Sequence, residues 1–158
     1  MIARRLAVCA IASLLLAVPA LAAPALDGKG CAADYSAGED YFAEKSVVEY
    51  ADNFAVDYFD TYKIVTVQRP YPGGKPERYV LVQCGTPEPD LGPELAGAPR
   101  ITIPVRSLFA ASTSQGPALI SVGGLDALTG VAQRAFIATP EVIAHMETAG
   151  VVEYQASG

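Results

Sequence analysis

Two stretches dense in proline and glycine limit the length of every regular element that this chain can form. The first runs from Pro70 to Pro76 and the second from Gly85 to Pro99. Neither can continue a β-ladder, because proline has no amide proton and glycine weakens a strand. The sequence therefore predicts short strands and helices that are separated by loops.

Strand-forming runs lie on both sides of the first of these loops. Apolar and polar residues alternate in Phe54–Phe59 and Tyr62–Val67, which favours half-buried antiparallel strands joined as a hairpin by the turn at 60–61. The apolar residues of Val47–Tyr50 predict an earlier strand, and Tyr79–Cys84 predicts another after the loop.

The next apolar run, Ile101–Val105, begins as a strand, and Pro104 favours an edge position or a bend before a helical continuation through Ser107–Ala110. Beyond Gly116, apolar residues with helical spacing reach Val131. Gly123-Gly124 interrupts this spacing, which predicts two short helices.

The last part of the chain carries a helix start. Thr139 is a candidate cap, Pro140 suits the first helical position and Glu141 complements the positive end of the helix dipole. This helix is expected to end near Gly150, with short strands at 136–137 before it and 151–154 after it.

These elements predict an α/β protein, in which an amino-terminal β-hairpin region precedes a Rossmann-like parallel sheet flanked by helices. The expected organisation is a signal peptide at 1–22, an extended segment at 23–45 and an α/β lobe at 46–158.

Residues 1–22 have the pattern of a secretory signal peptide. Arg4 and Arg5 precede an apolar stretch, Leu6–Val18, and small residues at 20–22 suit cleavage after Ala22. The apolar run is shorter than the roughly 20 residues of a membrane-spanning helix. A lipid on Cys31 is an alternative, but the residues before it lack the usual apolar character, so we expect a periplasmic or secreted protein.

Cleavage would remove Cys9 and leave Cys31 and Cys84, which allow one disulfide in an oxidising compartment. Two unpaired buried cysteines are the alternative. Cleavage would also leave nine Lys and Arg against 17 Asp and Glu, a net charge of −8. This charge repels phosphate backbones, so we predict no nucleic-acid partner.

The usual enzymatic motifs are missing from the sequence: there is no phosphate-binding loop, dinucleotide fingerprint, nucleophile elbow or Cys-x-x-Cys pair. His145 is the only histidine, and we interpret it as a helix residue, with a share in a metal site as the alternative. Acidic residues also gather before and within the hairpin, and we interpret them as a solvated face, with paired acid/base carboxylates as the alternative. They are Glu39, Asp40, Glu44, Glu49, Asp57 and Asp60. We therefore predict no catalytic residue, metal or cofactor.

A polar run suggests a binding site instead. Ser112, Thr113, Ser114 and Gln115 directly follow an apolar run, and Thr139 follows the predicted strand at 136–137. Ligands bind outside the carboxyl ends of strands in open parallel sheets. We therefore predict that these five residues bind a ligand, sharing a rim with residues 155–157. That Ser112 and Thr139 only cap helices is the alternative.

Several strings resemble the periplasmic substrate-binding proteins of ABC importers, of the iron-siderophore and vitamin B12 class. The similarity covers most of the mature chain, and Tyr79–Pro87 is its most specific part. The strings are Cys31 with Asp34-Tyr35, Asp40–Phe42 with Lys45, Phe54–Tyr58, Tyr62–Val67, Arg78–Pro87 and Ile103–Ser107.

This resemblance implies two α/β lobes joined by a rigid helix, a metal chelate or corrinoid held between them, and a membrane permease as partner. The family pattern also contains both cysteines. Because such proteins are about twice as long, we expect this chain to be the amino-terminal lobe alone. A truncated gene product is favoured over half of a split protein, and weak ligand binding would follow from the missing second lobe.

The leading hypothesis is thus the solute-binding component of an importer. The first alternative is a secreted, non-catalytic interaction module. The second is a secreted hydrolase that uses the hydroxyls of Ser112–Ser114 with His145 as base, which requires serine and histidine within hydrogen-bond reach.

Overall fold

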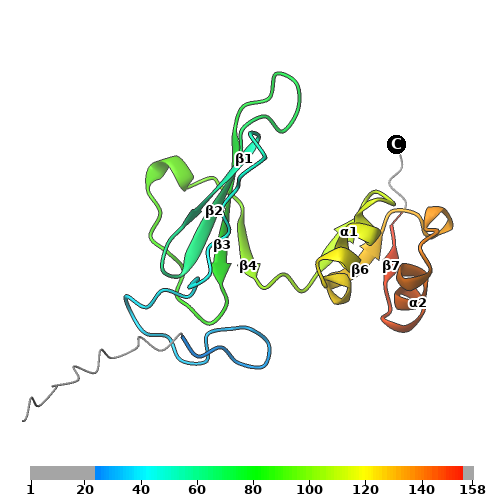
Figure 1. Ribbon diagram of the computed structural model, residues 1–158, viewed down its shortest axis with the longest axis horizontal. Helices are drawn as coiled ribbons and strands as arrows, with labels where there is room; N and C mark the ends of the chain where they lie inside the picture. The colour runs from blue at the N-terminus through cyan, green and yellow to red at the C-terminus, as the bar shows by residue number, and fades with distance from the viewer. Residues whose placement is uncertain (1–23, 155–158) are drawn as a thin grey trace, which may run out of the picture.

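The computed structural model describes residues 24–154, which form a four-stranded mixed sheet followed by a small three-stranded parallel sheet with two helices (Figure 1). The protein is therefore of the mixed α/β class. The predicted signal peptide at 1–22 and the predicted rim segment at 155–157 lie outside the described residues.

The first sheet contains β1 (Phe54–Tyr58), β2 (Tyr62–Val67), β3 (Glu77–Gln83) and β4 (Arg100–Ile103), in that spatial order. β1 pairs with β2 and β2 with β3 in antiparallel fashion, which confirms the predicted hairpin. β4 runs parallel to β3. A parallel neighbour needs a long crossover, and residues 84–99, with the short 3-10 helix η1 (Pro93–Leu95), provide it.

The core of this sheet lies under the crossover. Val80 is fully buried, and Ile64, Val82 and Leu95 are each less than 9% exposed. Leu95 comes from η1 and borders the same cavity as Ile64, so the crossover covers one face of the sheet.

Residues 24–53 contain no helix or strand apart from an isolated bridge between Leu26 and Ala32. The strand predicted at Val47–Tyr50 is therefore wrong. Val47 is 79% exposed and Tyr50 is 94% exposed, so these apolar side chains have no packed surface to hold them in a ladder. Tyr41, in contrast, is buried, and its amide donates to the Asp60 carbonyl at 2.8 Å, which docks the segment on the β1–β2 turn.

The second unit alternates strands and helices, and its three strands pair in parallel in the order β5-β6-β7. Its elements are β5 (Leu108–Ala110), α1 (Gln115–Ser121), η2 (Leu125–Ala127), β6 (Leu128–Val131), η3 (Arg134–Phe136), α2 (Pro140–Thr148) and β7 (Val152–Glu153). The predicted strand and helix alternation is confirmed, but three of its elements differ.

The helical continuation predicted over Ser107–Ala110 is wrong, because Leu108–Ala110 is strand β5 and pairs with β6. Leu128–Val131 is likewise a strand, although the sequence predicted a helix face there. Gly123, at a φ of +67°, follows the end of α1 and prevents the helix from continuing. Leu128–Val131 can therefore pair as a strand. The strand predicted at 136–137 is replaced by η3 and the residue after it.

The strands from Ile101 onward, which the sequence predicts to form one parallel sheet, belong to two sheets. β4 closes one edge of the first sheet and stops at Ile103, directly before Pro104, whose missing amide proton cannot extend the ladder. The chain then passes through residues 104–107 to β5, so the α/β lobe expected at 46–158 contains two separate sheets (Figure 1).

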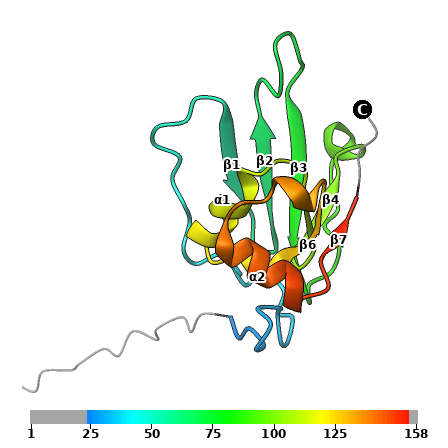
Figure 2. The ribbon, with the colours of Figure 1, turned by 90° about the vertical axis from the view of Figure 1, so that its right-hand side faces the viewer.

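The two helices cover the same face of the small sheet. Gly116 of α1 is buried against α2, where an added Cβ would lie 2.8 Å from Cγ2 of Val142. The core of the unit joins strand and helix residues; its buried members are Ala110, Leu128, Val131, Val142, Met146 and Val151. Figure 2 views the molecule from the side of this unit, with α2 toward the viewer.

Helix α2 agrees closely with its prediction. Thr139 precedes it, Pro140 and Glu141 occupy its first turn, and it ends at Thr148. Gly150 then adopts a φ of +66°, the left-handed conformation that commonly follows a helix end.

Within residues 24–154 no helix has both the length and the apolar character needed to cross a membrane.

Candidate functional site

The candidate site lies where β5 and β6 end. Ala110 pairs with Val131 at the last step of this parallel ladder, so the loops that follow the two strands leave the sheet side by side. They enclose a small cavity of about 50 Å³. Its walls are Ala110, Ala111, Ser112, Thr113, Ala132, Gln133, Phe136 and Ile137.

Two of the five predicted ligand-binding residues, Ser112 and Thr113, line this cavity. Ser114 ends the same loop and Gln115 is the first residue of α1, and their side chains lie within hydrogen-bond distance of Ser112. The Ser114 hydroxyl lies 3.0 Å from the Ser112 hydroxyl, and the Gln115 side-chain oxygen accepts the Ser112 amide proton at 3.0 Å. The turn is thus closed by its own side chains, while Ser112 and Thr113 border the cavity.

Thr139 takes a different position from the one predicted. It follows η3 and not a strand, and it is absent from the walls of the cavity. Its carbonyl accepts the Ile143 amide proton at 3.0 Å, as expected at the start of a helix. Its hydroxyl makes no capping hydrogen bond, and neither does that of Ser114 before α1. Ser112 precedes the cap position of α1, whereas Thr139 is the N-cap residue of α2 without a side-chain hydrogen bond.

The structure adds Gln133 and Phe136 to the rim. Both follow β6, for which the sequence predicts a helix, so the sequence contains no signal that marks the loop after it as a strand end. Phe136 is 67% exposed, so its ring is open to solvent beside the cavity. The cavity therefore combines hydroxyl and amide groups with one exposed ring.

The serines and the histidine of the hydrolase hypothesis lie at opposite ends of the small sheet. The His145 ring nitrogen is 3.2 Å from the carbonyl oxygen of Leu128, the first residue of β6, whereas Ser112 follows the far end of β5. Three residues of strand span about 10 Å. This separation exceeds hydrogen-bond reach, so the structure does not form the serine–histidine pair.

The described residues also contain no group of three or more His, Cys, Asp or Glu side chains able to hold a metal ion. His145 is a half-buried helix residue whose ring nitrogen contacts a backbone carbonyl. Of the acidic residues, Asp40 pairs with Lys45 at 2.7 Å, and this hydrogen bond, with one from the Phe42 amide, lowers the pKa of the Asp40 carboxyl.

The face of the small sheet opposite the helices is uncovered. Phe109 of β5 is 45% exposed, and Val152 and Tyr154 at the β7 end are more than 60% exposed. The Phe109 and Tyr154 rings meet edge to face at 5.7 Å. Gly130 lies between them, and its missing side chain leaves room for the Phe109 ring, which an added Cβ would approach to 2.8 Å.

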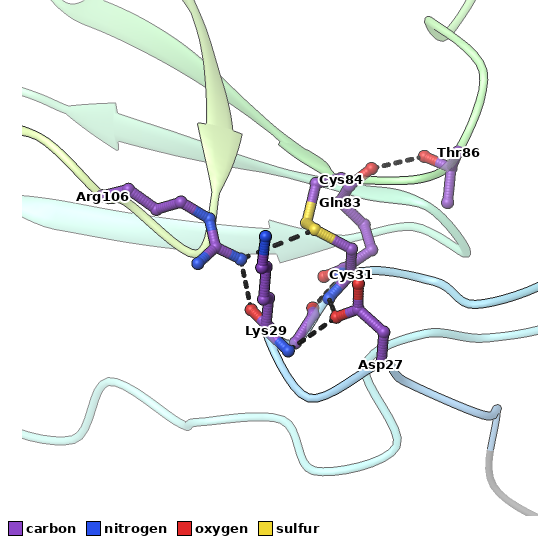
Figure 3. The surroundings of a disulfide bond; sticks show 8 residues. Asp27, Lys29, Cys31, Gln83, Cys84, Thr86 and Arg106 are labelled. Carbon is purple, nitrogen blue, oxygen red and sulfur yellow. Dashed lines mark hydrogen bonds between the residues drawn. A yellow bond between two sulfur atoms is a disulfide. The ribbon is translucent and has the colours of Figure 1, made fainter.

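A disulfide joins Cys31, in the segment before β1, to Cys84, which directly follows β3 (Figure 3). It lies at the junction between the two units, because Arg106 of the linker after β4 contacts the Cys31 sulfur. The bridge confirms the predicted pairing, and disulfides of this kind are typical of oxidising compartments. The buried Gln83 side chain donates to the Gly30 carbonyl at 2.6 Å. The Arg106 guanidinium donates to the Lys29 carbonyl and, at 3.6 Å, to the sulfur of Cys31.

Asp27 completes this junction. Its carboxylate accepts the amide protons of Cys31 and Lys29 at 2.9 and 2.8 Å, and these hydrogen bonds lower its pKa (Figure 3). The segment before β1 and the linker after β4 are therefore joined at one point. Any ligand site on the small unit is held to the first sheet through this connection.

The chain matched no protein-family model, no curated protein and no solved structure. The fold and the rim described above are accordingly the basis for a function.

Proposed function

We propose that this protein is an exported solute-binding component of an ABC-type importer. One wall of its ligand site is the β5–β6 rim, formed by the loops 111–113 and 132–137 that follow these two strands. The observation that carries the proposal is the parallel β5-α1-β6-α2-β7 unit, whose adjacent strand ends place Ser112, Thr113 and Gln133 around one cavity. Ligand sites of open α/β sheets occupy this edge.

The chemistry of the rim suits a ligand that carries oxygen atoms and an apolar surface. Hydroxyl and amide groups donate to oxygen, and the exposed Phe136 ring offers a flat apolar contact. Together with the resemblance noted in the sequence, this favours an iron-siderophore, a corrinoid or another metal chelate. The Rossmann-like character of the unit and its role as one lobe of a two-lobed protein belong to the same proposal.

The size of the cavity has a further consequence. Small-molecule sites generally enclose about 300–1,000 Å³, whereas this cavity measures about 50 Å³. It can hold only one edge of a chelate, so a second wall must complete the site. Weak binding by the chain alone is expected for this reason.

The disulfide and the amino-terminal leader support export to a compartment where such a protein would meet its permease. The permease is the expected membrane partner. No bound cofactor is part of the proposal, since the chelate is the cargo.

Binding can be tested by NMR on the mature chain, titrated with gallium-loaded siderophores and with cobalamin, which are diamagnetic. We expect millimolar or weaker binding, with amide shifts confined to 111–113 and 132–137. Thr113→Val and Gln133→Leu should reduce these shifts. Ser121→Ala is a matched control, because the Ser121 hydroxyl bonds the Ala118 carbonyl within α1. Shifts located elsewhere, or none with any of these ligands, would contradict the proposal.

The uncovered face of the small sheet favours a second candidate, a secreted non-catalytic interaction module. Phe109, Val152 and Tyr154 form an exposed apolar patch of the kind that contacts other macromolecules. Crosslinking in the native cell envelope distinguishes the two functions. Capture of a permease supports the importer, whereas capture through Tyr154 of a protein that belongs to no importer supports the module.

A further inference from the structure

A second and larger cavity, of about 460 Å³, opens on the four-stranded sheet at the β1–β2 turn. Three segments that are distant in sequence form its walls: the turn at 35–38, the hairpin turn at 58–62 and the crossover loop at 89–90. The lining residues are Tyr35, Gly38, Tyr58, Phe59, Asp60, Thr61, Tyr62, Pro89 and Asp90. Its volume lies within the usual range for small-molecule sites.

Backbone hydrogen bonds hold these walls in place. The Tyr41 amide donates to the Asp60 carbonyl at 2.8 Å, and the Gln83 amide donates to the Thr61 carbonyl at 2.9 Å. The Phe59 amide closes the hairpin turn by donating to the Tyr62 carbonyl at 2.9 Å. The cavity is therefore formed in the absence of a ligand, which reduces the entropic cost of binding.

Four of the lining residues are aromatic, namely Tyr35, Tyr58, Phe59 and Tyr62. Phe59 and Tyr62 stack with their centroids 4.5 Å apart and their planes 8° from parallel. Phe59 is 42% exposed and Tyr35 is 46% exposed, although aromatic side chains of this size contribute most when buried. Their exposure around a shared cavity leaves aromatic surface that a bound molecule can contact.

All charged groups in the lining are negative. Asp60 and Asp90 contribute two carboxylates, and the lining contains no Lys, Arg or His. Aromatic faces attract cations through their quadrupole, and carboxylates add to this attraction. The Lys63 ammonium lies 5.6 Å from the Tyr58 ring centroid and 5.3 Å from that of Phe42, so one lining ring already contacts a cation of this chain.

We propose that this cavity binds a small organic cation of the alkylammonium class, held between the aromatic rings and the carboxylates of Asp60 and Asp90. The cavity lies on the four-stranded sheet, apart from the β5–β6 rim, so it is a second site independent of the proposed uptake ligand. Its expected affinity is in about the millimolar range, which corresponds to a few exposed ring and carboxylate contacts.

The test compares choline with 3,3-dimethylbutanol, which has the same shape without the charge. Binding to the mature, disulfide-bonded chain is measured by tyrosine fluorescence and NMR shifts. We expect choline to bind about ten-fold more tightly or better, with shifts at 35–38, 58–62 and 89–90, and to lose affinity as salt is raised. Equal binding of the two compounds, or preferential binding of an uncharged sugar, would overturn the proposal.

Substitutions locate the site. Asp60→Asn and Asp90→Asn keep the size of each side chain and should each weaken choline binding by about three- to ten-fold. Asp126→Asn removes an exposed acid from η2 and should leave binding unchanged. Phe59→Leu should also weaken binding, and the two Asp variants keep the test valid if this change unfolds the hairpin. Unchanged choline affinity in both folded Asp variants would refute the assignment.

Discussion

Removal of the Cys31–Cys84 disulfide is expected to destabilise the four-stranded unit strongly. The two cysteines are 53 residues apart in the sequence. In the chain-entropy model a closed loop of this length limits the unfolded state enough to contribute about 4 kcal/mol. Domains of this size have a total unfolding free energy of about 5–15 kcal/mol.

Few other contacts hold the segment around Cys31 to the first sheet. Residues 24–53 contain no helix or strand, and near Cys31 the Ala32 amide donates to the Cys84 carbonyl at 2.8 Å. The Gln83 and Arg106 side chains also donate to backbone carbonyls of this segment (Figure 3). Without the covalent link, these contacts must offset the entropy of ordering the whole segment.

Urea unfolding of the mature chain and of a Cys31→Ala/Cys84→Ala double variant measures the effect. Seven of the eight tyrosines lie between residues 35 and 79, so tyrosine fluorescence reports on the first unit. With an m-value of about 1–3 kcal/mol/M, the midpoint should fall by about 1.3–4 M urea. The reduced wild-type chain should behave like the double variant. A midpoint shift below about 0.5 M in both would refute this reasoning.

Three other predictions follow from single contacts. Gly85→Ala should destabilise the first unit by about 1–3 kcal/mol in urea unfolding, because Gly85 has a φ of +83° and an added Cβ would lie 2.3 Å from the Ala32 carbonyl oxygen. Met146→Ala should cost the small unit about 2–5 kcal/mol, since Met146 is 5% exposed, and loss of helical circular dichroism at lower temperature would show it. Glu77→Gln should lower the pKa of Tyr79, which the Glu77 carboxylate raises above 10.0 by accepting its hydroxyl proton at 2.6 Å. An unchanged ultraviolet titration of the tyrosines in Glu77→Gln would contradict the last prediction.

Local chemistry predicted the elements whose signals are complete within a few residues. The hairpin followed from alternation on both sides of a two-residue turn, and α2 followed from its Thr-Pro-Glu start and its terminal glycine. The strand at Val47–Tyr50 failed because β-propensity without a pairing partner does not make a strand. The helix predicted at Leu128–Val131 was wrong because a run of four residues, three of them buried, fits a helix face and a buried strand equally well.

Which site residues the sequence predicts depends on how the residues before them are interpreted. Ser112 and Thr113 were recognised because they follow an apolar run that ends in the strand β5. Gln133 and Phe136 were missed because the strand before them was mistaken for helix. Thr139 was predicted to bind the ligand because the sequence predicts a strand at 136–137, where the chain forms η3 and the residue after it.

The sequence by itself determined the leader pattern, the single cysteine pairing available after cleavage, the hairpin and the final helix, because each depends on residues that are adjacent or on a count. The tertiary structure decided which sheet each strand joins, which loops meet at a strand end and which aromatic side chains surround a cavity. These outcomes depend on the pairing of distant residues, such as Ala110 with Val131, and on distant segments that line one cavity, such as those of Tyr35 and Asp90, which local propensity does not specify.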